Sequence, residues 1–335
     1  MRKFFIPLIL LFILAGCNTN PPIHPSLLPS VDSLMNSRPD SAYNVLNAIP
    51  EGSVRTRRDK AYYALLLTQA RHKNYIPLRN DSLIDIAVNY YRGSRNHEKY
   101  AKSLLYKGIC VEEINDPQKA IEIYAEAEKI ALQTKDYLTT GLINSQMAWL
   151  YQKIFIENQV DIDRYKRSMQ YFRLAGHKRN EYSVASLLGQ KYRSTVQLDS
   201  AYHYLHMALD LAREMEDSVA LFHNYSLLAS TYLIDEDYPH ARDISLYIIK
   251  NHGTVSFPSE TYHTLSRAYA LMGKADSARY YYESINKSAD PNSKHSQLKT
   301  LTEILKAENN YKEAILYSEQ YRKLADSIID ESRRL

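Results

Sequence analysis

The chain has 335 residues, of which 45% are hydrophobic, and its 42 basic and 38 acidic side chains leave a net charge of +4. This near balance lacks the concentrated basic field of nucleic-acid-binding proteins. Nine glycines are too few for glycine-rich phosphate loops or for an all-β fold with many tight turns.

The first 16 residues predict a secretory signal peptide. Arg2 and Lys3 precede an apolar run from Phe4 to Leu14, which is too short for a durable membrane span. The tail Leu14-Ala15-Gly16-Cys17 resembles the lipobox of bacterial lipoproteins, which implies that a lipid is attached to Cys17. The alternative is an ordinary signal peptide followed by a chance cysteine.

Residues 17–30 are expected to form an extended linker after the lipidated cysteine, because four prolines occur between Asn18 and Ser30. Asn18 stands where enteric lipoproteins retained in the inner membrane carry aspartate. The resemblance therefore favours an outer-membrane anchor, and the lack of an acidic cluster after Cys17, which lipoproteins sent to the cell surface often carry, favours the periplasmic side. With Cys17 lipidated, Cys110 has no disulfide partner and is predicted to be a small buried apolar residue.

Residues 31–335 show a repeated spacing. An apolar residue precedes a small one, and an aromatic or aliphatic residue follows three positions later. The small residues recur every 36 to 41 positions, at Gly108, Ala148, Gly189, Ala229, Ser266 and Thr302. Small residues also begin a second amphipathic run after most of them, at Ala120, Ala201, Ala241, Ala278 and Ala314. Periods of this length indicate an array of helix pairs.

This pattern resembles the tetratricopeptide repeat (TPR), which has a small residue where helix A crosses its neighbours, an aromatic residue one turn later, and an alanine early in helix B. The clearer repeats cover residues 96–335, and degenerate repeats cover 31–95. The resemblance implies an all-α, right-handed TPR-like α-solenoid of about eight antiparallel helix pairs. The period exceeds the usual 34 residues, and about eight extra residues at 156–163 are expected to form an insertion on one rim.

The 29 tyrosines are explained by this architecture. Tyr269 falls at the aromatic position of a helix A, and Tyr282 is expected to face the next repeat from a helix B. Tyrosine buries a large ring while its hydroxyl reaches a polar partner. The tyrosines in these positions therefore predict packing, not a ligand platform.

Catalytic and metal-binding motifs are missing from the sequence, which has no HExxH, CxxC, GxGxxG, P-loop or GxSxG pattern. His203 and His206 have a chelating spacing but no third ligand in sequence, and they are expected on the solvated surface. We therefore expect no enzyme activity, no cofactor and no metal.

Seven Asp-Ser-aliphatic tripeptides recur, beginning at Asp32, Asp40, Asp81, Asp199, Asp217, Asp276 and Asp326. Six of the seven are expected to begin helices, where Asp or Ser caps free backbone amides. The tripeptide also resembles an O-glycosylation sequon of exported proteins in some Gram-negative gut bacteria. Capping accounts for most copies without this modification.

The TPR resemblance implies a concave binding groove built mainly by the A helices. The residues that flank the small positions are the candidates for it, namely Glu112, Trp149, Gln152, Lys153, Gln190, Arg193, His223, Ser230, His263 and Arg267. Trp149 is either a binding hot spot or part of the core between repeats. The carboxylate clamp of chaperone-binding TPRs is not found at the matching positions.

These features predict a membrane-anchored TPR lipoprotein that acts as a non-catalytic protein–protein interaction scaffold in the bacterial envelope. Its partner would be an envelope protein or a peptide segment, and no nucleic-acid partner is expected. One alternative is a lipoprotein that binds a glycan or a small solute during nutrient uptake. Another is a sensor or regulatory module that lacks its output domain.

Overall fold

The computed structural model describes residues 20–154, 159–251, 259–285 and 291–334. The predicted signal peptide and Cys17 fall outside these ranges. The described residues form sixteen α-helices and no strand. The chain divides into two compact units, unit 1 up to Leu150 and unit 2 from Tyr151 onward.

The first seven helices begin in unit 1. They are α1 (Leu27–Leu34), α2 (Pro39–Asn47), α3 (Arg57–Lys73), α4 (Ser82–Arg92), α5 (His97–Glu113), α6 (Pro117–Thr134) and α7 (Tyr137–Ile154). Unit 2 contains α8 (Gln159–Leu174), α9 (Lys178–Ser194), α10 (Leu198–Glu214), α11 (Ser218–Ile234), α12 (Tyr238–Asn251), α13 (Ser259–Leu271), α14 (Ala275–Glu283), α15 (Pro291–Ala307) and α16 (Tyr311–Arg334).

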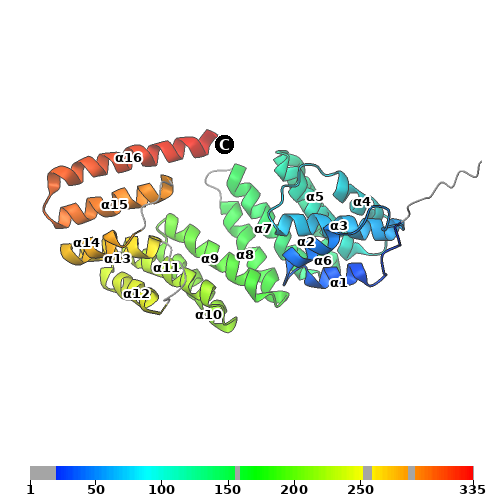
Figure 1. Cartoon of the computed structure of the whole chain (residues 1–335), viewed down its shortest axis with the longest axis horizontal. Helices are drawn as coiled ribbons and strands as arrows, with labels where there is room; N and C mark the ends of the chain where they lie inside the picture. Colours follow the sequence, from blue (N-terminus) through cyan, green and yellow to red (C-terminus); the bar gives the residue numbers. More distant parts are fainter. Residues whose placement is uncertain (1–19, 155–158, 252–258, 286–290, 335) are drawn as a thin grey trace, which may run out of the picture. The chain divides into compact units, whose positions relative to one another are not determined.

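Successive helices pack against one another from α1 to α6 in unit 1 and from α8 to α16 in unit 2 (Figure 1). Odd-numbered helices also contact one another, with α1, α3 and α5 in series in unit 1 and α9, α11, α13 and α15 in series in unit 2. We call these two series the odd-helix layers. This arrangement is the predicted all-α solenoid of helix pairs.

The small residue of the repeat lies where two helices approach closely. A Cβ atom added to Gly108 would lie 2.3 Å from the ring of Tyr124, and one added to Gly189 would lie 2.6 Å from Leu205. At the same position in α13, the Ser266 hydroxyl donates a hydrogen bond to the Ala278 carbonyl of α14 at 2.6 Å. These contacts explain why larger side chains are excluded at the crossing point.

The tyrosines pack as predicted. Tyr192 of α9 stacks on Tyr204 of α10 with ring centroids 5.6 Å apart, and Tyr269 of α13 stacks on Tyr281 of α14 at 5.5 Å. Tyr282 packs against a small core that includes Ile304 of the next pair. Each pair is therefore joined to its neighbour by a local cluster, as expected for a repeat array.

Nine interhelical turns among the described residues share one backbone geometry. A residue with positive φ ends one helix, and the next residue donates its N–H to a carbonyl five positions earlier. This hydrogen bond is typical of the Schellman motif. The positive-φ residues are Tyr75, Asn115, Lys135, Gly176, Val196, Glu216, Glu236, Gly273 and Asn309.

The segment after Cys17 differs from the prediction. Helix α1 begins at Leu27, inside the predicted linker 17–30, and Leu28 is buried in the first core. Earlier in the segment, Ile23 N–H donates to the Ser53 carbonyl at 3.1 Å, and the Arg55 guanidinium donates to the Asn20 carbonyl at 2.9 Å. Apolar burial therefore prevails over the extended preference of the prolines, and the chain is docked from Asn20 onward.

Two further predictions concern local features. Cys110 is buried and free, and burial raises the pKa of its thiol to about 12. Among the Asp-Ser tripeptides, Asp32 lies near the end of α1 and Asp326 lies within α16, so five of the seven stand at helix starts and not the predicted six. Both exceptions lie in amphipathic helices that begin several residues earlier.

The expected insertion at 156–163 is only partly described, because residues 155–158 fall outside the described ranges. Residues 159–163 form the first turn of α8. Asp161 in this turn is buried and pairs with the Lys191 ammonium of α9. This part of the insertion is therefore integrated in the helix packing.

Candidate functional site

Polar side chains gather along the odd-helix layer of unit 2. They come from four helices, and we call them the polar row. The polar row consists of Arg193 of α9, Ser230 of α11, Glu260, His263 and Arg267 of α13, and Lys299 and Glu303 of α15. Helix periodicity explains the set, since Ser230, Arg267 and Glu303 each follow the small residue of their helix by one position.

Arg193 and Ser230 connect α9 to α11. The Arg193 Nη1 group donates to the Ser230 hydroxyl at 2.5 Å, and this hydroxyl donates in turn to the Leu227 carbonyl at 2.9 Å. Burial lowers the pKa of Arg193, and the charge of Glu260 acts in the opposite direction. The Arg193 Nε–H is buried without a hydrogen-bond partner among the described residues. Arg193 therefore retains donor capacity.

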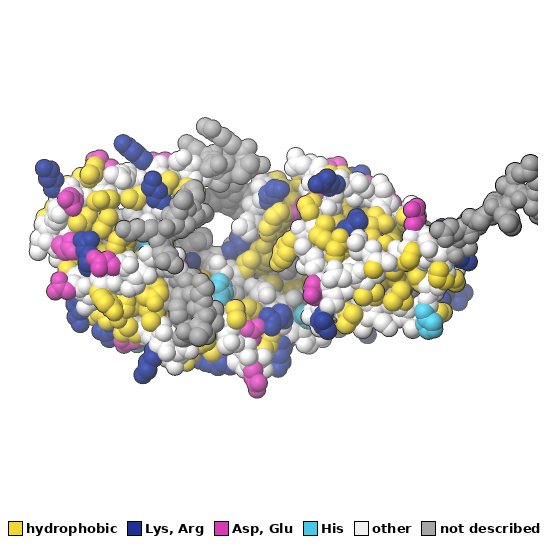
Figure 2. All heavy atoms as spheres, viewed as in Figure 1, with side chains coloured by type: hydrophobic (Ala, Val, Ile, Leu, Met, Phe, Trp, Pro, Cys, Tyr) yellow, Lys and Arg dark blue, Asp and Glu magenta, His cyan; other side chains and the backbone are white. Residues whose placement is uncertain are grey.

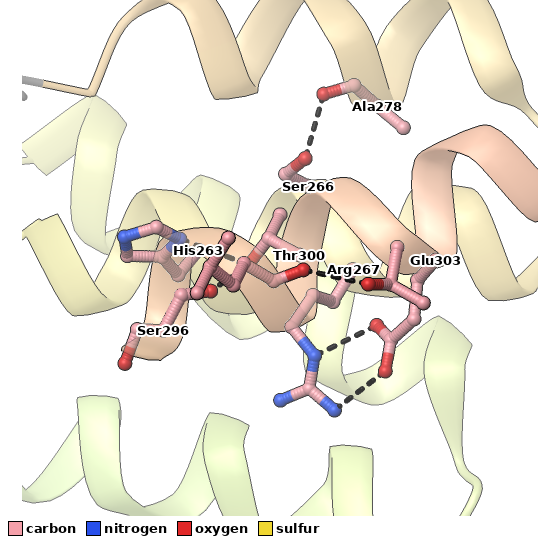
Figure 3. Close-up of polar contacts among 9 residues, drawn as sticks. His263, Ser266, Arg267, Ala278, Ser296, Thr300 and Glu303 are labelled. Atoms are coloured by element: carbon pink, nitrogen blue, oxygen red, sulfur yellow. Dashed lines mark hydrogen bonds and ion pairs between the residues drawn. The ribbon is translucent and has the colours of Figure 1, made fainter. Parts of the chain in front are cut away.

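His263 connects α13 to α15 (Figure 3). Its Nδ1 lies 2.9 Å from the Thr300 hydroxyl, and that hydroxyl donates its only hydrogen to the Ser296 carbonyl at 2.8 Å. His263 must therefore carry its proton on Nδ1 and donate it to Thr300. The other ring nitrogen, Nε2, is then a buried acceptor that has no partner among the described residues.

The imidazole of His263 is held neutral by its surroundings. Its side chain is only 3% exposed. Burial, with a smaller contribution from the charge of Arg267, lowers the pKa of His263 to about 4. The ring can accept a hydrogen bond at neutral pH but resists protonation.

Arg267 and Glu303 form a bidentate ion pair one turn further along the same two helices. Arg267 Nε donates to Glu303 at 2.7 Å and Nη2 donates at 3.0 Å, as Figure 3 shows. Lys299 lies half-buried nearby, and burial lowers its pKa while Glu303 and Glu260 oppose that shift. The polar row therefore combines positive and negative side chains and does not present a single charge.

The other expected groove residues are more dispersed. In unit 1, Glu112 is half-buried and accepts a hydrogen bond from Tyr124 Oη at 3.0 Å, and Trp149 is 46% exposed on α7. At the end of α7, Gln152 and Lys153 are exposed. In unit 2, Gln190 is half-buried beside the polar row, and His223 is exposed on α11. The structure thus brings together Arg193, Ser230, His263 and Arg267 of the ten.

The described residues contain no cluster of three His, Cys, Asp or Glu side chains that could hold a metal ion. His203 and His206 are both exposed on α10. Within the same described ranges, no helix combines the length and apolar character needed to span a bilayer. On the face in view in Figure 2, basic and acidic side chains are interspersed in each unit.

Comparison with known proteins adds to this geometry. No protein-family model matches the chain. A curated relative, the transcriptional activator NprA of Geobacillus stearothermophilus, is 25% identical over 178 residues, which are 52% of this chain and 43% of NprA. The chain therefore spans less than half the length of that relative.

Three solved structures share the fold at low sequence identity. Apo RapI superposes with a TM-score of 0.69 at 13% identity, covering 92% of this chain and 97% of RapI. NprR in complex with its cognate peptide NprX gives a TM-score of 0.52 at 16% identity, covering 92% and 96%. A tetratricopeptide repeat protein from Parabacteroides merdae gives 0.52 at 15% identity, covering 82% of this chain and 97% of that protein.

The chain is a TPR-type solenoid. Its odd-numbered helices correspond to the A helices of the repeat, and the polar row lies on those of unit 2. This assignment rests on the helix-pair packing and on the structural similarity together.

Several members of the polar row were missed by the sequence reasoning, namely Glu260, Lys299 and Glu303. The sequence did contain the information needed to find them. Each of the three lies at the same number of positions from the small residue of its repeat as one of the predicted groove residues does. Glu260 precedes Ser266 by six positions, as His223 precedes Ala229. Applying the TPR register to every repeat would have found Glu260, Lys299 and Glu303.

Proposed function

We propose that this TPR solenoid is a membrane-anchored lipoprotein that acts as a non-catalytic protein–protein interaction scaffold in the bacterial envelope. The observation that carries the interaction role is the polar row, in which Arg193 and His263 keep hydrogen-bonding capacity that no described group uses. The partner is an extended peptide segment of another protein.

The chemistry of the row suits such a segment. A peptide backbone offers alternating C=O acceptors and N–H donors. Arg193 supplies a donor, and His263 supplies a neutral acceptor. Arg267 and Glu303 can exchange part of their mutual ion pair for contacts with polar side chains of the ligand. The mixture of positive and negative charges favours sequence selectivity over binding to any charged chain.

The comparisons support a peptide partner. NprR has the same fold and was solved with its cognate peptide NprX, and a Rap protein of this fold was solved in complex with Competence and Sporulation Factor. The partial match to NprA, a transcriptional activator, favours a second candidate. In that second candidate, the array is the sensor or regulatory module of a signalling system.

The membrane anchor is proposed from the lipobox-like Leu14-Ala15-Gly16-Cys17. The docking of Asn20 to Glu51 and Arg55 refines this proposal. Only Asn18 and Thr19 separate Cys17 from Asn20, which limits the tether to about 10 Å. The lipid would hold the start of unit 1 close to the bilayer, with almost no spacer.

The experiment is cross-linking and affinity recovery of the lipidated protein from its native membranes, with partners identified by mass spectrometry. The test variant combines Arg193→Met, Arg267→Met and Glu303→Met. Both members of the Arg267–Glu303 pair are removed together, so that neither is left half-buried without the other. The control combines Arg167→Met, Arg213→Met and Asp210→Met, which removes the same charges from α8 and α10, including the exposed Arg213–Asp210 pair.

A discrete protein recovered with the wild type and the control, but lost with the test variant, is the expected result. Recovery with all three forms would place the binding surface away from the polar row. If no protein is recovered in any form, the scaffold role fails, and retention on a polysaccharide panel would then support the glycan-binding alternative.

A further inference from the structure

Three lysines converge on the odd-helix layer of unit 1. Lys73 ends α3, and Lys99 and Lys102 lie in the first two turns of α5. The charge of Lys102 acts on both of the others, and Lys102 Nζ lies 3.7 Å from Asp32 of α1. We call Lys73, Lys99 and Lys102 the lysine cluster.

The cluster has fewer anions than cations around it. Asp32 is the carboxylate nearest to it, and Asp32 Oδ2 already accepts a hydrogen bond from Tyr62 Oη at 2.5 Å. Glu98 acts on Lys99 more weakly than Asp32 does, and the exposed Arg58 adds a fourth positive charge. Around Lys99, the negative charges of Asp32 and Glu98 thus face the positive charges of Lys102 and Arg58 in addition to that of Lys99 itself.

These lysines are not fully solvated surface groups. All three are half-buried, and burial is the main cause of the lowered pKa of Lys73 and Lys99. The Lys99 ammonium lies 4.0 Å from the ring centroid of Tyr62, and Lys73 Nζ donates to Asn36 Oδ1 at 2.8 Å. Partly desolvated cations without a matching counter-ion are destabilising, and an anion bound between them would offset that cost.

A hollow adjoins the cluster. It has a volume of about 530 Å³ and is lined by His72, Lys73, Tyr75, Ile76, Pro77 and Glu113. In the wall of the hollow, the Glu113 carboxylate accepts a hydrogen bond from the Leu78 backbone N–H at 2.6 Å, which fixes the position of the Glu113 side chain. A chain whose anionic group reached the lysines would therefore have room to continue beside Lys73.

We propose that the lysine cluster is a binding site for the carboxylate groups of an acidic peptide segment. The site lies within unit 1 and goes beyond the proposed function, which rests on the polar row of unit 2. The carboxylates can belong to Asp and Glu side chains or to a C-terminus, since both present the same group to an ammonium.

The test measures binding to the full chain by isothermal titration calorimetry at low salt. The probes are acetyl-hexaglutamate amide, which has side-chain carboxylates only, acetyl-hexaglycine with a free terminal carboxylate, and inorganic phosphate. The test variant is Lys99→Met with Lys102→Met, in which methionine retains most of the apolar stem. The control is Lys119→Met with Lys129→Met, which removes two exposed lysines from α6 of the same unit.

We expect one of the two peptides to bind the wild type, and the more tightly bound one identifies the source of the carboxylate. The test variant should weaken that affinity at least tenfold, and the control less than twofold. Equal weakening by both variants would reduce the effect to net charge and overturn the site. Absence of peptide binding, or tighter binding of phosphate than of either peptide, would also overturn it.

A second measurement covers the possibility that the test variant does not fold. Lysines of the wild-type protein are labelled by reductive ¹³C-methylation and followed by NMR while the bound peptide is added. The signals of Lys73, Lys99 and Lys102 should shift while those of Lys119 and Lys129 stay in place. Shifts confined to other lysines would place the binding elsewhere and refute the proposal.

Discussion

His263 shows at the scale of one residue how the fold prepares a hydrogen-bond acceptor. The Thr300 hydroxyl donates its hydrogen to the Ser296 carbonyl, so it can only accept from His263. The proton of the neutral His263 ring therefore lies on Nδ1. Burial keeps the ring neutral. The Nε2 atom of His263 is therefore a buried acceptor in unit 2 with no hydrogen-bond partner among the described residues. A peptide N–H could donate to it.

This arrangement predicts a pH dependence of stability. The pKa of His263 is about 4 in the folded protein and 6.5 as its ordinary value. Between these values the unfolded chain binds more protons, so stability is complete above pH 6.5 and falls as the pH falls toward 4. Urea unfolding at pH 7 and pH 4.5 should show that the wild type loses about 2 kcal/mol more than His263→Asn. An equal loss in both proteins would show that His263 titrates normally in the folded state.

Two buried asparagines provide a second residue-scale prediction. Asn224 of α11 is fully buried, and neither of its amide atoms has a partner among the described residues. Asn144 of α7 is equally buried but donates to Glu128 at 2.8 Å and to the Thr140 carbonyl at 3.0 Å. Asn224→Ala should raise the free energy of unfolding by about 1 kcal/mol, whereas Asn144→Ala should lower it by about 1–3 kcal/mol.

Chemical denaturation of the two alanine variants checks this contrast. A loss of stability in Asn224→Ala as large as that in Asn144→Ala would mean that an internal water serves the Asn224 amide.

At the scale of elements, the shared turn is the main device that links the helices. Each of these turns needs a residue with positive φ, and glycine adopts that conformation without steric strain. Gly176 and Gly273 meet this need, but Val196 occupies the same position with φ 57°. A β-branched residue there is strained, and its side chain is 63% exposed, so it gains little from packing.

Val196→Gly should therefore stabilise the protein by about 1 kcal/mol, since the strain relieved exceeds the added freedom of the unfolded chain. The reciprocal change, Gly176→Val, should destabilise it by about 1–2 kcal/mol. No atom lies within 4 Å of a Cβ added at Gly176, so the loss would come from the backbone alone. Thermal unfolding of the two variants with the wild type measures both effects. A destabilised Val196→Gly protein would contradict the strain argument.

The spacing of small residues predicted the helix pairs because close helix crossings exclude large side chains, as at Gly108 and Gly189. The docking of residues 20–30 was missed, although Leu27 and Leu28 are apolar, because the prolines around them favoured an extended chain. The lysine cluster could not be predicted from spacing. Lys102 and Asp32 lie 70 positions apart, and only the packing of their helices brings the Lys102 ammonium within 3.7 Å of the carboxylate.

For the whole molecule, the proposed lipid anchor at Cys17 can be tested directly. In the native host, Cys17→Ala should release the protein from the membrane fraction, because the proposed thioether cannot form without the thiol. Cys110→Ala serves as the control and should remain with the membrane, since Cys110 is buried within the fold. Fractionation with immunoblotting measures the release, and intact mass should show the wild type beginning at a lipidated Cys17. An unlipidated mature chain would refute the anchor.

The shared turn also affects how odd-numbered and even-numbered helices are distinguished. It joins helices inside a pair, as at Asn115 and Val196, and it joins one pair to the next, as at Lys135 and Glu216. Such a turn does not distinguish odd from even helices, so the order of the chain alone decides which layer each helix enters. Insertion or loss of one helix early in unit 2 would exchange odd and even positions for every later helix of that unit, and the residues of the polar row would no longer share the odd-helix layer. An array of this kind can therefore change its length without losing its binding residues only by an even number of helices.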